Sequence, residues 1–139
     1  MLVNGQNKKL TFTEILNKNA NKIVNVDFWA SWCAPCVTAM PSSKALQKAY
    51  TDVTFVYLSI DDSFEKWQQS SKKHNLEKLK YNYLIENRYT STFLESLGLS
   101  SIPRYLIFDR KGNLVHQNAP GSDSDEIRDL FDKYLNEWD

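Results

Sequence analysis

The part of this sequence that most constrains its fold is an apolar run that leads directly into two cysteines, Val26-Asp27-Phe28-Trp29-Ala30-Ser31-Trp32-Cys33-Ala34-Pro35-Cys36. The chain has only two cysteines, so any thiol chemistry must take place here. A bulky strand that runs straight into Cys-x-x-Cys is the layout that makes a thiol reactive. The stretch therefore predicts a redox centre at a strand-to-helix junction.

The spacing of the two cysteines also predicts their roles. A helix that begins at about Ala34 points its unpaired N–H groups and the positive end of its dipole at Cys33, which favours the thiolate. Pro35 falls in the first turn, where a missing N–H costs nothing. Cys36 follows one turn later and deeper. We expect Cys33 to attack a substrate and Cys36 to resolve the product.

Two other uses of a cysteine pair are weaker explanations of this stretch. A structural zinc site takes four ligands, usually from two such pairs, whereas the remaining soft ligands are His74 and His116, far apart in the sequence. An inert buried pair does not account for the strand that precedes it. We therefore expect no metal and no cofactor.

Length and charge limit the class of protein. The chain of 139 residues suits one globular domain, residues 1–139. Its formal net charge of zero gives no excess of positive charge for binding nucleic acid or an anionic membrane. No run approaches the roughly 20 apolar residues of a membrane span, and the N-terminus lacks the apolar region of a signal peptide. A cytoplasmic protein and an excised domain of a longer protein both remain open.

The pattern of apolar residues predicts an alternation of strands and helices. We expect a hairpin over residues 2–11, a helix that starts at Thr11 or Thr13, a central strand over Ile23–Trp29, and a helix from Ala34 to about Tyr50 that is kinked at Pro41. Further along we expect a strand over 53–60, a helix opening at Asp62, an edge strand over 81–85, a helix over 90–97 ended by Gly98, a hairpin over 101–117, and a helix capped by Ser122 or Asp123.

Asp27 stands out because it interrupts an apolar strand just before the cysteines. Burial of an ionised carboxylate is costly, so its pKa should rise. It could then exchange a proton with Cys36. The alternative is a solvated aspartate on a frayed strand.

Several motifs occur together and in order: Asp27-Phe28-Trp29-Ala30, Trp32-Cys33-Ala34-Pro35-Cys36, Ile102-Pro103 and the Gly112 hairpin. In this the chain resembles the thioredoxin family over nearly its whole length. The N-terminal hairpin, an insertion over about 61–90 and Met40-Pro41 are similar to the TlpA/ResA-type branch. The resemblance implies a thioredoxin fold of class α/β, with a central mixed sheet flanked by helices. It also implies an extracytoplasmic protein, tethered to a membrane or joined to a further domain.

The resemblance further implies where a substrate binds. Pro103 would be a cis proline that faces the thiols, and the backbone of Ile102 would pair with an extended substrate segment. Trp32, Ala34 and Pro35 would form the other wall of the binding surface. Arg104 would lie at its rim.

Three positions depart from the family pattern. Many relatives have a glutamate where this chain has Ala39, and thioredoxins proper commonly have a lysine where it has Tyr57. Arg104 replaces a threonine, and it would either favour acidic substrates or have no role. Without a cationic partner, Asp27 should be still more reluctant to ionise.

The sequence thus predicts a thiol-disulfide oxidoreductase that exchanges a Cys33–Cys36 dithiol with protein disulfides, as a reductant supplied by an upstream electron donor. A thiol peroxidase would share the fold, but Ser31-Trp32-Cys33 lacks the usual Thr-x-x-Cys pattern. A metal-delivery or docking module is the other alternative, and its third ligand would be His116. We interpret His116 instead as a strand residue near solvent and His74 as a cation near a helix C-terminus.

Overall fold

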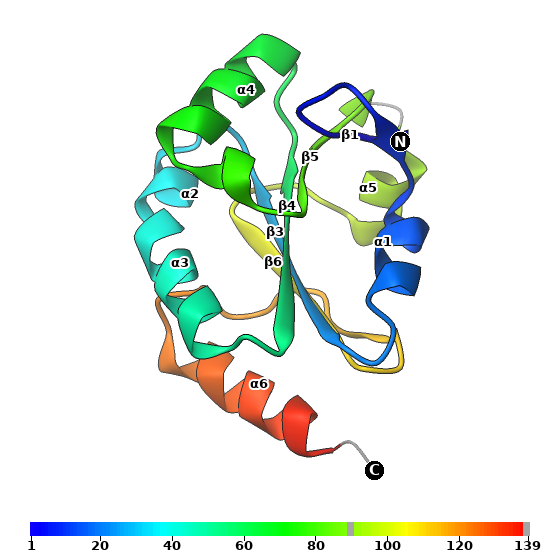
Figure 1. Cartoon of the computed structure of the whole chain (residues 1–139), viewed down its shortest axis with the longest axis vertical. Helices are drawn as coiled ribbons and strands as arrows, with labels where there is room; N and C mark the ends of the chain where they lie inside the picture. The colour runs from blue at the N-terminus through cyan, green and yellow to red at the C-terminus, as the bar shows by residue number, and fades with distance from the viewer. Residues whose placement is uncertain (89–90, 138–139) are drawn as a thin grey trace.

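The computed structural model describes residues 1–88 and 91–137, and these form a seven-stranded sheet with helices on both faces (Figure 1). The strands are β1 (Leu2–Val3), β2 (Lys9–Leu10), β3 (Ile23–Trp29), β4 (Val53–Ser59), β5 (Asn82–Ile85), β6 (Arg104–Phe108) and β7 (Leu114–His116). Their order across the sheet is β2-β1-β5-β4-β3-β6-β7. The predicted α/β fold with a central mixed sheet is confirmed.

The helices form two layers around this sheet. They are α1 (Phe12–Lys18), α2 (Ala34–Thr38), α3 (Met40–Ala49), α4 (Phe64–Lys73), the short 3₁₀ turn η1 (Leu76–Lys78), α5 (Thr92–Leu97) and α6 (Asp125–Asn136). Figure 1 shows α1 and α5 on one side of the strands and α2, α3 and α4 on the other, with α6 at the lower end. Among the described residues, none of the helices has the length and apolar character needed to cross a membrane.

β3 is the strand that positions the candidate site. It is parallel to β4 and antiparallel to β6, and all seven of its residues are buried. A strand that is covered on both faces has apolar residues at most of its positions, here at all but Asn25 and Asp27. This pattern predicts the bounds Ile23–Trp29 correctly. The loop that leads to the cysteines begins at the carboxyl end of β3.

The helix after the cysteines is divided in two, as the sequence predicts. α2 ends at Thr38 and α3 starts at Met40, with Ala39 between them. Pro41 has no N–H to donate to the carbonyl of Val37, and its ring crowds that carbonyl, so the helix cannot continue unbroken. The break separates a short segment with the cysteines from the packed α3.

The N-terminal hairpin is confirmed, and it changes the expected position of another strand. Leu2 pairs with Leu10 within the hairpin and with Ile85 of β5. β5 therefore lies between β4 and β1, and the prediction of an edge strand over 81–85 is wrong. Alternation within a strand does not reveal which neighbours later add to it.

Two helix starts differ from the predictions because a nearby serine caps the helix instead. Ser63 accepts from the N–H of Lys66 and starts α4, and Ser124 accepts from the N–H of Ile127 and starts α6. α5 starts after Ser91, and the predicted start at Thr90 lies outside the described residues.

Residues 61–90 hold α4, η1 and β5. Their assignment as an insertion in a single domain stays a prediction.

Candidate active site

Cys33 and Cys36 lie just beyond the carboxyl end of β3 and are joined by a disulfide bond, with their Cα atoms 5.3 Å apart. Cys33 caps α2, and the backbone N–H of Cys36 donates to Cys33 Sγ at 3.3 Å. Cys33 is 5 % exposed and Cys36 is 2 % exposed, while Ala34 and Pro35 between them are exposed. Both cysteines are thus buried, Cys33 slightly less than Cys36, and a hydrogen-bond donor lies beside Cys33 Sγ that would stabilise its thiolate.

Asp27 lies within β3 with only 7 % of its surface exposed. Among the described residues, none donates a hydrogen bond to its carboxyl group. Burial therefore raises the pKa of Asp27 from its ordinary 3.8 to about 8. The predicted buried carboxyl with a raised pKa is confirmed, and the alternative of a solvated aspartate is not what the structure contains.

Two tyrosines flank Asp27 in the sheet. Its register partners are Tyr57 on β4 and Tyr105 on β6. Directly paired residues share a face of the sheet, and the Tyr57 hydroxyl contacts Ser43 and Gln47 of α3. Asp27 therefore lies on the face that α2 and α3 cover. Burial raises the pKa of each tyrosine, and the nearby Asp27 raises it further.

The structure accounts for the departure from the family pattern at Tyr57. This residue lies directly beside Asp27, where it brings a neutral hydroxyl and no cation. Tyr105 on the opposite side was not predicted, because the pairing of β6 with β3 cannot be derived from local patterns. Asp27 consequently has a neutral tyrosine beside it on each neighbouring strand, in agreement with a pKa raised by burial alone.

A second buried carboxylate, Asp61, holds the loop that leads to the cysteines. The Ser31 N–H donates to both carboxylate oxygens, at 3.1 and 3.0 Å, and the Ser31 hydroxyl donates to Oδ1 at 2.6 Å. The Ser59 hydroxyl donates to Oδ2 at 2.6 Å. Asp61 is 4 % exposed and lies two residues beyond the end of β4, so it ties the end of that strand to the turn after β3. The two acids that end this strand in the sequence were a signal for such a role.

The second predicted wall of the site comes from the segment before β6. The Ile102–Pro103 peptide bond is cis. Arg104 Nε donates to the Gln117 carbonyl at 2.9 Å, and Nη1 donates to the Leu97 carbonyl at 2.6 Å. The Arg104 guanidinium thus links the end of α5 to the segment after β7. Its role in substrate binding stays a prediction.

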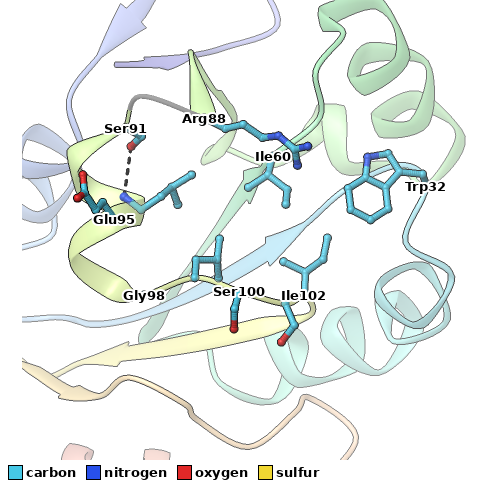
Figure 2. A pocket seen from close by; sticks show the side chains of 11 residues that line it. Trp32, Ile60, Arg88, Ser91, Glu95, Gly98, Ser100 and Ile102 are labelled. Carbon is cyan, nitrogen blue, oxygen red and sulfur yellow. Dashed lines mark hydrogen bonds between the residues drawn. The ribbon is translucent and has the colours of Figure 1, made fainter.

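A groove with a volume of about 850 Å³ separates this segment from the cysteine loop. Trp32, Ile60 and Ile102 line it, as do Arg88 and residues of α5 and the segment after it (Figure 2). Trp32 is 61 % exposed, so a large apolar side chain is open to solvent next to the cysteine pair. Arg88 comes from beyond β5, and the sequence carried no signal that it belongs to this groove.

Neither histidine lies in this arrangement as a metal ligand. His116 is on β7, with Nε2 2.9 Å from the Tyr134 hydroxyl. His74 does cap the C-terminus of α4, but burial and the neighbouring Lys73 and Lys44 lower its pKa. The predicted position of His74 at a helix C-terminus is confirmed, and its lowered pKa disfavours the cationic form. No cluster of three metal-binding side chains occurs within residues 1–88 and 91–137.

A sequence model of a family described as Thioredoxin-like matches residues 21–114, which include β3, both cysteines and the cis proline. The chain belongs to the thioredoxin-like family. The recognition made from the motifs around Cys33 and Pro103 is thereby confirmed.

Individual relatives agree with this membership. A candidate thiol-disulfide oxidoreductase from Bacteroides vulgatus has a TM-score of 0.81 and 27 % identity, with 96 % of this chain and 90 % of that chain covered. A thiol-disulfide oxidoreductase from Bacteroides fragilis has the same fold, with a TM-score of 0.74 and 22 % identity over 93 % and 94 % of the two chains. Thioredoxin from Bos taurus is 41 % identical over 54 residues, which are 39 % of this chain and 51 % of that protein. The match thus spans about half the length of this curated relative.

Proposed function

We propose that the protein is a thiol-disulfide oxidoreductase that reduces disulfides in other proteins. The observation that carries the proposal is the Cys33–Cys36 disulfide at the start of α2, on the same side of the sheet as the buried Asp27. Family membership supports thiol-disulfide chemistry in general. The direction of electron flow and the substrate class are our inference.

The reaction begins with the reduced protein. The Cys33 thiolate attacks one sulfur of a substrate disulfide, the substrate S–S bond breaks, and the other substrate sulfur leaves as a thiolate that takes up a proton. A mixed disulfide now joins Cys33 to the substrate. Cys36 loses its proton and attacks Cys33 Sγ, which forms the Cys33–Cys36 disulfide and releases the second substrate thiol. Two electrons pass from the protein to the substrate, and an upstream donor must restore them.

Asp27 is suited to take the proton from Cys36. A base works best when its pKa is near that of the acid, and the ordinary thiol pKa of about 8.5 lies close to the value of about 8 for Asp27. An exposed aspartate would be too weak a base for a thiol. The burial that raises its pKa is therefore what equips it for this role.

The residues between the cysteines support the reducing direction. Ala34 and Pro35 bring neither a charge nor an imidazole that would stabilise the thiolate further. This favours a potential closer to that of thioredoxin, about −270 mV, than to that of the oxidant DsbA, about −120 mV. Trp32, Ala34 and Pro35 on one side, and Ile102, Pro103 and Arg104 on the other, would bind the substrate. By resemblance we place the protein in an extracytoplasmic compartment.

The two single-cysteine variants test the roles directly. Reduced Cys36→Ser should form a stable covalent complex with a disulfide-containing protein such as insulin, because Cys33 can attack and nothing resolves the product. Cys33→Ser should form little or none, because Cys36 is more deeply buried. Non-reducing electrophoresis separates the complexes. A complex only with Cys33→Ser, or with neither variant, would contradict the proposed mechanism.

A further inference from the structure

The groove beside the disulfide contains a cation that the proposed exchange reaction does not use. Among the described residues that line it, Arg88 carries the positive charge and Glu95 the negative charge. Figure 2 shows the Arg88 guanidinium directed towards Trp32 over Ile60, whereas Glu95 lies at the opposite end of the pocket. The end of the groove nearest Cys33 is thus apolar with a cation above it.

Arg88 is held in this place by a residue outside the groove. Its Nε lies 3.1 Å from Oδ1 of Asp62, whose side chain is 61 % exposed, while the Arg88 side chain is 21 % exposed. The acid is in contact with water, which weakens its effect on the cation. A guanidinium has five N–H donors in a planar fork, so an ion pair through Nε orients it and does not prevent it from binding a second carboxylate.

The lining and the size of the groove suit a short segment of extended polypeptide. Trp32, Ile60 and Leu99 contribute apolar side chains to the lining of the groove, which also includes the segment from Gly98 to Ile102. Its volume of about 850 Å³ is sufficient for several side chains. The segment that fills it would have its cysteine next to Trp32 and an adjacent side chain below Arg88.

We propose that this groove selects substrate proteins that carry an aspartate or glutamate close to the reacting cysteine, and that Arg88 is the residue that recognises it. The proposal rests on the proposed function, because the segment is bound in order to be reduced. It assigns to Arg88 the preference for acidic substrates that the sequence suggested for Arg104. Arg88 lines the groove, whereas Arg104 is not among the residues that line it and donates to the carbonyls of Gln117 and Leu97.

Three peptides with one disulfide each, identical except for Glu, Gln or Lys next to a cysteine, test this selectivity. At low salt we expect kcat/KM to be about two- to fivefold higher for the Glu peptide than for the Gln peptide, and lowest for the Lys peptide. The difference should lie mainly in KM, because the contact is present in both ground and transition states. It should diminish as salt is added.

Arg88→Gln should remove the preference and Arg88→Lys should retain part of it. Lys48→Gln on the exposed surface of α3 makes the same change in net charge and should retain all of it. Equal rates for the three peptides, or a preference that survives in Arg88→Gln, would overturn the proposal while leaving the reductase function intact. If Arg88→Gln does not fold, a Glu-to-Gln ratio in the unsubstituted protein that is independent of salt overturns it instead. Reduction of none of the peptides, nor of insulin, would overturn both.

Discussion

Asp27 is the residue whose physical state most depends on its surroundings. It is a carboxyl group among neutral side chains, with a pKa of about 8 in place of 3.8. The main electrostatic feature of Asp27 is thus the protonation of a buried group, and not an ion pair, on the face of the sheet that α2 and α3 cover. A lysine beside it would hold the carboxyl ionised, and Tyr57 cannot.

We expect Asp27 to make stability depend on pH between about 4 and 8. Below pH 4 both the folded and the unfolded chain hold the proton. Between pH 4 and pH 8 only the folded chain holds it, so the free energy of unfolding falls as the pH rises, by up to about 1.4 kcal/mol per unit. Urea unfolding of the oxidised protein and of Asp27→Asn over this range measures the effect. Parallel pH profiles for the two proteins would contradict it.

Asp61 should matter for stability far more than its neighbour Asp62. Asp61→Asn removes a charged acceptor from buried hydrogen bonds to Ser31 and Ser59, which should cost about 1 to 3 kcal/mol. Asp62→Asn removes an ion pair with Arg88 in which the acid is 61 % exposed, and it should stay within about 0.5 kcal/mol. The urea midpoints of the two variants at equal m-value give the comparison. A similar loss for both would show that Asp61 does not hold the loop.

At the scale of elements, the parts with strong local signals could be predicted from the sequence. The bounds of β3, the cap at Thr11, the break before Pro41 and the Gly98 end of α5 follow from patterns within a few residues. Gly98 ends its helix with a φ of 60°, where a side chain would be strained. Such features depend on short-range sterics and hydrogen bonds, which the sequence displays directly.

The parts that could not be predicted depend on which elements meet. That β5 is an interior strand, that Tyr105 lies beside Asp27, and that Arg88 enters the groove all follow from pairings between distant segments. Local pattern is enough to predict a site at Cys33, Cys36 and Asp27, whereas the hydrogen bonds of Asp61 depend on a contact between two distant segments. The pattern of side chains along an element indicates which of its residues are buried, but it does not indicate which other elements lie beside it.

The N-terminal hairpin should contribute to stability because it closes the edge that β5 would otherwise expose. Leu2 is 4 % exposed and lies against the core, while Leu10 on the outer strand is only partly buried. We expect Leu2→Ala to cost about 2 to 4 kcal/mol and Leu10→Ala clearly less. Thermal and urea unfolding measure both. Equal small losses would indicate that the hairpin is only loosely attached to the sheet.

At the scale of the whole molecule, redox state and folding are linked. A fold that stabilises its disulfide relative to the dithiol makes the dithiol a reductant, whereas DsbA is an oxidant because its reduced form is the more stable. We therefore expect the oxidised protein to unfold at a higher urea concentration than the reduced protein. Unfolding curves in the presence and absence of a reductant test this. A reduced form that is more stable than the oxidised form would indicate instead a protein that forms disulfides in its substrates.

The central claim is that the Cys33–Cys36 pair is a reductant, and its equilibrium with glutathione is the most direct test. The fraction of protein oxidised, measured over a range of glutathione ratios at pH 7, gives the potential of the pair. We expect a value nearer to −270 mV than to −120 mV, from the uncharged Ala34 and Pro35 and the buried Asp27. A potential near −120 mV would contradict the account and assign the pair to disulfide formation.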